Sequence, residues 1–298
     1  MYLNLKAGVR GAVRTNEPLS EHTTWRIGGP ADYFVQPAGL EDLQFVTRFA
    51  AARRLPLTVM GNGSNLLVSD AGLRGILVRM GRGMEQVLID GNVILVQGGA
   101  RLPRVIKAAG GAGLGGLEFL IGIPASVGGA VVMNAGANGL CLGDRVEEVI
   151  LVDREGVIHR RSRTELGFGY RWSDLQTGGA IVSEVILRCL PRQRDEIGRE
   201  MKLFLHRRRE TQPLDHPSAG CVFKNPSGDS AGRLIEAAGG KGLRVGNAEV
   251  SQKHANFILN LGGATARDVM ILIGRIRRLV KDKFGIELGL EVNLMGDF

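Results

Sequence analysis

Glycine content most constrains how this chain can fold. Of the 298 residues, 44 are glycine, about twice the roughly 7% usage of average proteins. The glycines gather in clusters without the fixed period of a collagen helix. Because glycine allows left-handed backbone and close approach of another group, such clusters indicate loops shaped around a ligand.

The most apolar glycine-containing stretch, residues 119–143, holds no charged residue. Its length alone would suffice to cross a bilayer, but six glycines, Pro124 and two asparagines interrupt it. Lipid cannot satisfy so much irregular backbone. We therefore expect a buried loop that encloses a large ligand, and no membrane insertion.

Apolar periodicity predicts an α+β chain rather than a regularly wound parallel sheet. Strands are expected at 32–37, 57–60, 76–79, 146–152, 157–161, 181–190 and 286–294, a hairpin at 86–96, and helices at 40–54, 102–109, 196–210 and 266–284. Thr265 and Asp268 form a capping box for the last helix, and Gly285 stops it. A domain boundary is expected in the proline-containing linker 211–220.

Charge and cysteine content limit the classes of function. A net charge of +8 and a pI near 9.8 suggest an anionic partner, either nucleic acid or a phosphorylated small molecule. The three cysteines, Cys141, Cys189 and Cys221, form no C-x-x-C pair, and the histidines lack metal-ligand spacing. No signal peptide is recognised at the amino terminus. We expect a cytoplasmic protein without a disulfide framework or a metal.

Two glycine clusters are candidates for binding a phosphorylated cofactor. In the first, Gly61-Asn62-Gly63-Ser64-Asn65-Leu66 follows a predicted strand, and its successive N–H groups can cradle phosphate oxygens. It is not the dinucleotide fingerprint, because the sixth position is Leu66. An ordinary tight turn fits it equally well.

The second cluster suits a diphosphate and an isoalloxazine ring, because it promises many unhindered amides in an apolar setting. A glycine-rich packing corner is the alternative. Its candidate residues are Gly122, Ile123, Pro124, Ser126, Gly128, Gly129, Asn134, Ala135 and Gly136.

Three polar positions outside these clusters are candidates for chemistry. Arg171, held among aromatic residues, can present its fork to a carboxylate, although a surface arginine stacked on rings is the simpler interpretation. Lys224-Asn225 offers a cation and an amide for phosphate or sugar contacts. Glu291 lies on the polar face of the final predicted strand, where pattern alone indicates an ordinary exposed carboxylate.

Several motifs together resemble the UDP-N-acetylenolpyruvoylglucosamine reductase family, in its shorter second type. They occur in family order from about residue 20 to the end. The motifs are His22-Thr23-Thr24-Trp25-Arg26-Ile27-Gly28-Gly29-Pro30-Ala31-Asp32, the Gly61 loop, Gly122-Ile123-Pro124, Met133-Asn134-Ala135-Gly136, Tyr170-Arg171, Phe223-Lys224-Asn225-Pro226, Gly232-Arg233-Leu234-Ile235-Glu236 and the stretch 250–257.

The resemblance implies a domain plan. Residues 1–195 would form a two-part FAD-binding module of the vanillyl-alcohol oxidase (PCMH) type, with subdomains 1–78 and 79–195. Residues 200–285 would bind a UDP-sugar, and 286–298 would return as a strand to the active site. FAD contacts are implied for both glycine clusters and for Trp25, Ile27 and Ile181. Substrate contacts are implied for Tyr170, Arg171, Lys224, Asn225 and His254.

The resemblance also implies a reaction. NADPH would reduce FAD, the flavin N5 would pass hydride to C3 of UDP-N-acetylglucosamine enolpyruvate, and an acid would protonate C2, giving UDP-N-acetylmuramate for peptidoglycan. Arg171 and Glu291 would stabilise the enolate-like intermediate. Cys221 stands where the family commonly has serine as proton donor, and a thiol, with an ordinary pKa of about 8.5, is the stronger acid. Water is the alternative donor.

Two other functions share some of these sequence features. An FAD-dependent alcohol or sugar oxidase of the same cofactor-binding superfamily would share the glycine clusters, but the combination of Tyr170, Lys224-Asn225 and Glu291 argues against it. A nucleic-acid-binding protein would use the Arg207-Arg208-Arg209 run, yet no recognition motif supports it. We expect no nucleic-acid partner, and a monomer.

Overall fold

The computed structural model describes every residue from 1 to 298. The chain folds into two compact units, neither of which is continuous in sequence. Unit 1 consists of Met1–Thr15, Tyr33–Asn62 and Gly75–Arg208, and unit 2 consists of Asn16–Asp32, Gly63–Arg74 and Arg209–Phe298. The domains expected from the sequence were defined by the ligand that each would bind, whereas these units are defined by compactness. The expected domain limits therefore stay a prediction.

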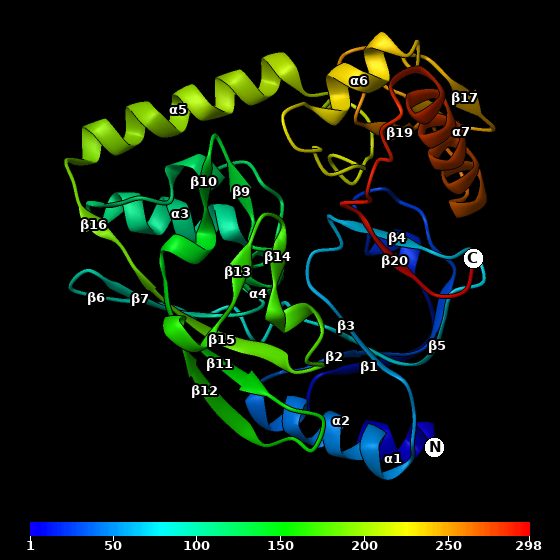
Figure 1. Cartoon of the computed structure of the whole chain (residues 1–298). Coiled ribbons are helices and arrows are strands. Elements are labelled where there is room, and N and C mark those ends of the chain that lie inside the picture. The colour runs from blue at the N-terminus through cyan, green and yellow to red at the C-terminus, as the bar shows by residue number, and fades with distance from the viewer. The chain divides into compact units, whose positions relative to one another are not determined.

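Unit 1 is built on a five-stranded sheet in which every neighbouring pair is antiparallel, in the order β12-β11-β15-β7-β6. Its strands are β6 (Val87–Asp90), β7 (Val93–Gln97), β11 (Val146–Val152), β12 (Ile158–Ser162) and β15 (Ile181–Arg188). Helices α3 (Leu102–Gly111) and α4 (Val127–Val132) pack their apolar residues with those of β7, β11 and β15 in one core. Figure 1 shows both helices beside this sheet.

A second core of unit 1 lies under two amino-terminal helices, α1 (Tyr2–Ala7) and α2 (Leu40–Ala52). Leu43, Val46 and Phe49 of α2 point into this core because they recur at helical spacing. The adjoining sheet has the order β1-β2-β5-β3, with β3 parallel to β5. Its strands are β1 (Ala12–Pro18), β2 (Pro30–Gln36), β3 (Leu57–Met60) and β5 (Leu73–Arg79).

Short elements complete unit 1. These are β8 (Leu114–Gly115), β9 (Gly136–Ala137), β10 (Leu140–Cys141), β13 (Phe168–Gly169), β14 (Trp172–Ser173) and β16 (Leu190–Pro191). The long helix α5 (Arg194–Thr211) has one fully buried residue, Ile197. Its Met201, Phe204 and Leu205 are half-buried against the larger core, so its remaining, mostly charged residues face water.

Unit 2 surrounds helix α7 (Ala266–Phe284), whose apolar side packs with α6 (Ala231–Ala237) and with a three-stranded sheet in one core. That sheet contains β17 (Arg244–Val245), β18 (Ala248–Val250) and β19 (Ile258–Asn260). The carboxy-terminal strand β20 (Asn293–Met295) runs parallel to β4 (Leu66–Val68). This pairing joins the end of the chain to the segment that follows the Gly61 loop.

Many predicted elements are confirmed, several with their limits. The strands at 57–60 and 146–152 and the helix at 266–284 have the expected bounds. Thr265 and Asp268 form the capping box, and Gly285 closes α7 in the left-handed conformation, with φ 70°.

The predicted strand over 286–294 is wrong. Only Asn293–Met295 is strand, and Leu294, expected on the buried face, is 39% exposed. The N–H groups of Glu291 and Val292 both donate to the Val222 carbonyl oxygen, at 2.8 and 3.3 Å. Two successive amides on one acceptor interrupt the ladder of a regular strand. The predicted alternation of burial is nevertheless kept as far as Val292, with Leu288 and Val292 buried and Glu287 and Gly289 exposed.

Candidate active site

The first glycine loop, residues 61–65, directly follows β3. A Cβ at Gly61 would lie 2.0 Å from Ser126 Oγ, and one at Gly63, whose φ is 65°, would lie 2.2 Å from the His22 carbonyl oxygen. The backbone N–H groups of residues 62–65 donate to no group of the protein. These four successive amides are available to donate to a bound anion, and such a run of N–H groups is suited to phosphate oxygens.

The second glycine cluster has fewer available amides than the sequence analysis predicted. Most of its amides already have acceptors in the protein, namely the N–H groups of Val127, Gly128, Gly129, Ala130, Met133, Asn134 and Ala135. Gly128 is needed for packing, because a Cβ there would lie 3.1 Å from the Gly98 carbonyl oxygen. Asn62 Nδ2 donates to the Pro124 carbonyl oxygen at 2.6 Å, so the two clusters touch in unit 1.

Tyr170 and Arg171 form the turn of the β13–β14 hairpin in unit 1. Arg171 has φ 53°, a left-handed conformation that is uncommon for a residue with a side chain. Its guanidinium carbon lies 5.4 Å from the centroid of the Tyr170 ring, in the range of a cation–π contact. Strained backbone of this kind is concentrated at functional sites.

In unit 2, backbone hydrogen bonds hold the segments of Cys221 and Glu291 together. Phe223 forms an antiparallel bridge with Leu290. The Glu291 N–H donates to the carbonyl oxygen of Val222, the residue after Cys221. The Glu291 carbonyl oxygen accepts from Asn65 Nδ2 at 3.0 Å. The Glu291 segment is therefore bonded both to the segment after Cys221 and to Asn65.

Three further polar candidates lie in unit 2. The Lys224 N–H donates to the Gly289 carbonyl oxygen at 2.8 Å, and Asn225 Oδ1 accepts from the Ala231 N–H at the start of α6. Burial disfavours the imidazolium form of His254 and lowers its pKa. Its Nδ1 accepts from the Asn256 N–H at 3.3 Å, so the neutral ring offers a proton at Nε2.

Comparison with known proteins decides the family. The C-terminal domain model of UDP-N-acetylenolpyruvoylglucosamine reductase matches residues 212–295, and an FAD binding domain model matches residues 31–162. The UDP-N-acetylenolpyruvoylglucosamine reductase of Moorella thermoacetica is 52% identical over 98% of this chain and 96% of its own length. The chain belongs to the UDP-N-acetylenolpyruvoylglucosamine reductase family. It is a flavin-dependent oxidoreductase of that family.

Further relatives agree with this membership. The reductase of Desulforamulus reducens is 47% identical over 98% of this chain and 97% of its own length. The crystal structure of the reductase from Thermus caldophilus covers 96% of this chain and 99% of that chain, with a TM-score of 0.83 and 41% identity. Berberine bridge enzyme from Eschscholzia californica covers 65% of this chain and 44% of that chain, with a TM-score of 0.50 and 20% identity, a likeness of fold alone. The predicted α+β FAD-binding fold is confirmed.

The residues present fit the FAD that the reductase family implies. The unbonded amides of residues 62–65 are suited to hold its diphosphate, and the close contact of Gly61 with Ser126 leaves no room for a side chain there. The apolar surroundings of the second cluster, with half-buried Ile123 and Ala125 against the larger core of unit 1, suit a flat ring system.

Four expected cofactor residues have their side chains in hydrophobic cores. Trp25 is fully buried, and its indole N–H donates to the Ile258 carbonyl oxygen at 2.9 Å. Ile27 and Leu66 are buried in unit 2, and Ile181 is buried in unit 1. Any contact that Trp25 makes with FAD would come from its backbone. These assignments stay predictions.

Two buried asparagines were missed by the sequence analysis. Asn256 Oδ1 accepts from the Phe223 N–H at 2.9 Å while its Nδ2 donates to the Phe223 carbonyl oxygen at 2.8 Å, so this side chain fixes the extended segment after Cys221. Asn260 donates to the Trp25 carbonyl oxygen and accepts from the Gly262 N–H. For Asn260 the following Gly-Gly pair is a recognisable turn signal. No local signal marks Asn256.

The structure shows no group of three or more His, Cys, Asp or Glu side chains arranged to hold a metal ion. None of its helices has the length and apolar character needed to cross a membrane. The three cysteines form no disulfide.

Proposed function

We propose that this chain reduces UDP-N-acetylglucosamine enolpyruvate to UDP-N-acetylmuramate, with NADPH as the electron source, in the synthesis of peptidoglycan precursors in the cytoplasm. The observation that carries the proposal is the 52% identity to the Moorella reductase over 98% of the chain. A match of this length covers both glycine clusters and the segments of Arg171, Cys221 and Glu291. We further propose that the protein acts as a monomer.

Arg171 is proposed to bind the substrate carboxylate. A guanidinium fork pairs with both oxygens of a carboxylate, and the attraction strengthens as negative charge builds on the enolpyruvyl group in the transition state. The left-handed backbone and the neighbouring Tyr170 ring restrict where this fork can point. Fixing the orientation of a reactant costs entropy, and here the folded hairpin fixes the orientation of the guanidinium before the substrate binds.

Cys221 is proposed to give the proton to C2, with Glu291 stabilising the charge that develops on the substrate. FAD, when bound, supplies the hydride for C3, having received it from NADPH. The hydrogen bonds of Val222 and Phe223 to Asn256 and to the Glu291 segment fix the backbone beside the thiol. A fixed donor protonates one defined face of the carbon.

The UDP-sugar is proposed to contact Tyr170, Lys224, Asn225 and His254. Lys224 brings a positive charge to a diphosphate, and the His254 ring, whose pKa is lowered by burial, offers a neutral donor to a sugar or a ribose oxygen. The proposed FAD site comprises residues 61–66, Trp25, Ile27, Ile181 and the second glycine cluster. Within that cluster Asn134 would contribute only its backbone, because its carboxamide bonds to Gly143 and Gly169.

The proposed reaction predicts a defined product. Purified protein, NADPH and the enolpyruvyl sugar should yield a compound two hydrogen atoms heavier than the sugar substrate by mass spectrometry. UDP-N-acetylglucosamine, which has no double bond to reduce, serves as the control and should remain unchanged. An unchanged mass of the enolpyruvyl sugar would contradict the proposal.

The role of Cys221 is tested by two substitutions. Cys221→Ser should retain turnover, and Cys221→Ala should lower it by about 10²-fold or more, because the second variant has no proton donor at this position. Flavin reduction by NADPH should be nearly unchanged in both variants. Cys141→Ala removes the other half-buried thiol and is the matched control. Full turnover in Cys221→Ala would show that water is the donor.

A further inference from the structure

Asn134 lies at the end of α4 in the second glycine cluster, and its side chain is committed to the protein. The residue is 3% exposed and has φ 43°. Its Nδ2 donates to the Gly169 carbonyl oxygen at 2.8 Å, and its Oδ1 accepts from the Gly143 N–H at 2.9 Å. Both ends of the carboxamide therefore have partners, and Gly169 is the last residue of β13 before the turn that contains Arg171.

The hairpin that carries Arg171 depends on such anchors. Its strands β13 and β14 are two residues each, too short to be stable as an isolated hairpin. Ser173 Oγ donates to the Val132 carbonyl oxygen at 2.6 Å, which attaches β14 to the end of α4. Gln176 Nε2 donates to the Arg171 carbonyl oxygen at 3.3 Å from an exposed position. Asn134 is the buried anchor on the β13 side.

The guanidinium is also close to this cluster. A Cβ built on Gly136, two residues after Asn134, would lie 3.1 Å from Arg171 Nη1. The segment that follows α4 therefore lies against the Arg171 hairpin at two points. The Asn134 side chain bonds to the strand before Arg171, and Gly136 lies beside the Arg171 guanidinium.

We propose that Asn134 is a positioning residue for Arg171. The Asn134 side chain acts on the hairpin rather than on the cofactor. The carboxamide fixes the turn from which the guanidinium projects, and so sets where the substrate carboxylate is held. This role rests on the function proposed above for Arg171. It predicts that changes at Asn134 affect transfer to the enolpyruvyl sugar and leave cofactor binding intact.

The first test needs neither cofactor nor substrate. In Asn134→Asp the acceptor for the Gly143 N–H is kept, while an oxygen replaces the donor that faces the Gly169 carbonyl. Hydrogen–deuterium exchange of the peptide 166–176 should quicken by at least about 3- to 10-fold, because one hydrogen bond is lost and a carboxylate oxygen then faces a carbonyl oxygen. Asn138→Asp controls for the same substitution outside the hairpin, at an exposed residue that is also left-handed, with φ 55°, and that accepts from Arg207.

The second test separates positioning from cofactor binding. Asn134→Asp should lower kcat for the enolpyruvyl sugar by about 10- to 100-fold, as expected when a binding group is displaced by about 1 Å. Flavin absorbance per protein and the rate of flavin reduction by NADPH should match the wild type. Asn134→Gly replaces this variant in the test if Asn134→Asp folds poorly. Glycine tolerates the left-handed backbone and removes both hydrogen bonds, so the same results are expected.

The double variant Asn134→Asp with Arg171→Ala decides whether the effect passes through Arg171. It should be no slower than Arg171→Ala alone. Additive losses would overturn the proposal, as would loss of flavin with normal exchange of the hairpin. A wild-type protein that leaves the enolpyruvyl sugar unreduced would overturn the proposed function alone, and the exchange experiment would still decide whether Asn134 anchors the hairpin.

Discussion

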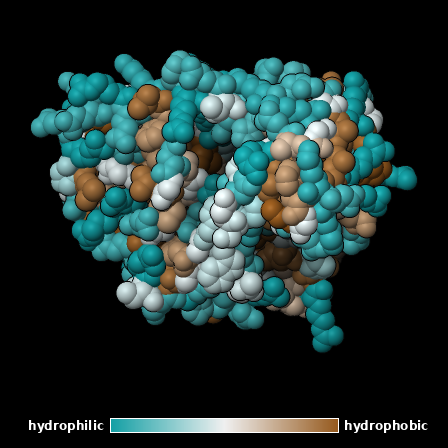
Figure 2. All heavy atoms as spheres, turned by 45° about the horizontal axis from the view of Figure 1, so that its top comes forward, coloured by the Kyte–Doolittle hydropathy of each residue, from teal (hydrophilic) through white to brown (hydrophobic).

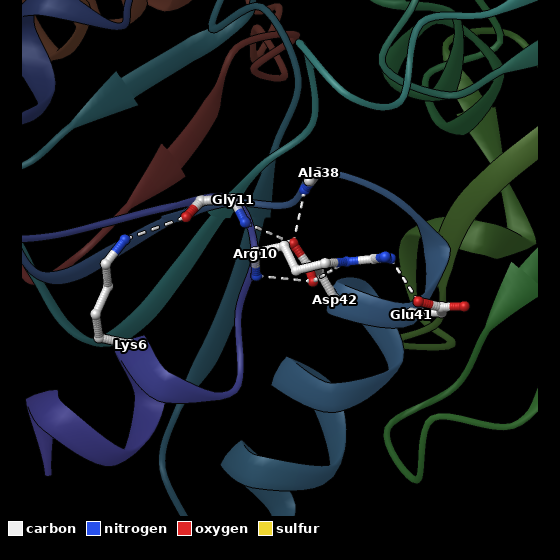
Figure 3. Close-up of polar contacts among 6 residues, drawn as sticks. All are labelled: Lys6, Arg10, Gly11, Ala38, Glu41 and Asp42. Carbon is white, nitrogen blue, oxygen red and sulfur yellow. Dashed lines mark hydrogen bonds and ion pairs between the residues drawn. The ribbon is translucent and has the colours of Figure 1, made fainter.

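Asp42 shows how a single buried carboxylate organises the start of helix α2. Its side chain is almost fully buried, and Figure 3 shows its two oxygens accepting from the backbone N–H groups of Arg10, Gly11 and Ala38. Burial by itself would raise the pKa of this carboxyl. The three N–H groups and the charge of Arg10 together stabilise the carboxylate more strongly, so the pKa lies below its ordinary value.

Replacing Asp42 by asparagine should destabilise the protein by about 2–3 kcal/mol at pH 7, because either orientation of the amide turns an NH₂ group toward N–H donors. Because its folded pKa is lowered, Asp42 stabilises the fold above its ordinary pKa and loses this effect as pH falls through the lowered value. The difference between variant and wild type should shrink in that acidic range. Urea unfolding at several pH values measures it.

The neighbouring Glu41 provides the control for Asp42. It also pairs with Arg10 but is largely exposed, so Glu41→Gln should change the free energy of unfolding by less than about 1 kcal/mol. Equal losses in the two variants would show that the ion pairs with Arg10, rather than the buried N–H groups, account for the stabilisation.

At this scale, sequence patterns predicted the glycine loops and the charged candidates, but not the side-chain hydrogen bonds that hold the neighbouring backbone. Gly61 and Gly63 were predictable because a tight, close-packed loop has few alternatives to glycine. Asn134 and Asn256 bond to groups 35 and 33 positions away. Local pattern carries no information about such partners. The amides of the second cluster bond mostly to nearby acceptors, in helix α4 and the turn after it, and the sequence analysis did not predict that helix.

Among the elements, α7 and the segment after it show why one prediction held and the next was wrong. Helix α7 contains its own signals: a capping box at Thr265, an apolar stripe, and Gly285 at the end. The segment 286–294 has an equally regular pattern, but its backbone takes its partners from Val222, Lys224 and Asn65. Those partners impose an irregular course that alternation of residue types cannot reveal.

Two glycines of this helix make a matched pair for a prediction. Gly274, exposed in the middle of α7 with open space around it, should gain about 0.5–1 kcal/mol of stability on substitution by alanine. Gly285, with φ 70°, should lose about 1 kcal/mol from the same change, because an alanine Cβ disfavours the left-handed conformation. Urea midpoints measure both, and shifts of equal sign would contradict this account of the helix end.

For the whole molecule, charge predicted an anionic partner without choosing its class. The net charge of +8 is compatible with FAD, NADPH and a UDP-sugar, all of which carry diphosphates. Figure 2 shows hydrophilic residues over much of one face, with hydrophobic groups scattered between them. That residues 16–32 and 63–74 join the carboxy-terminal third in one unit was not predicted, because an apolar stripe does not specify which distant stripe covers it.

The most direct test of the central claim is an anaerobic absorbance titration of the purified protein. Flavin bands should be present as purified or after addition of FAD, NADPH should bleach them, and UDP-N-acetylglucosamine enolpyruvate should restore them without oxygen. Bleached flavin that is restored only by oxygen would favour an oxidase, and a protein with no affinity for flavin would contradict the account altogether.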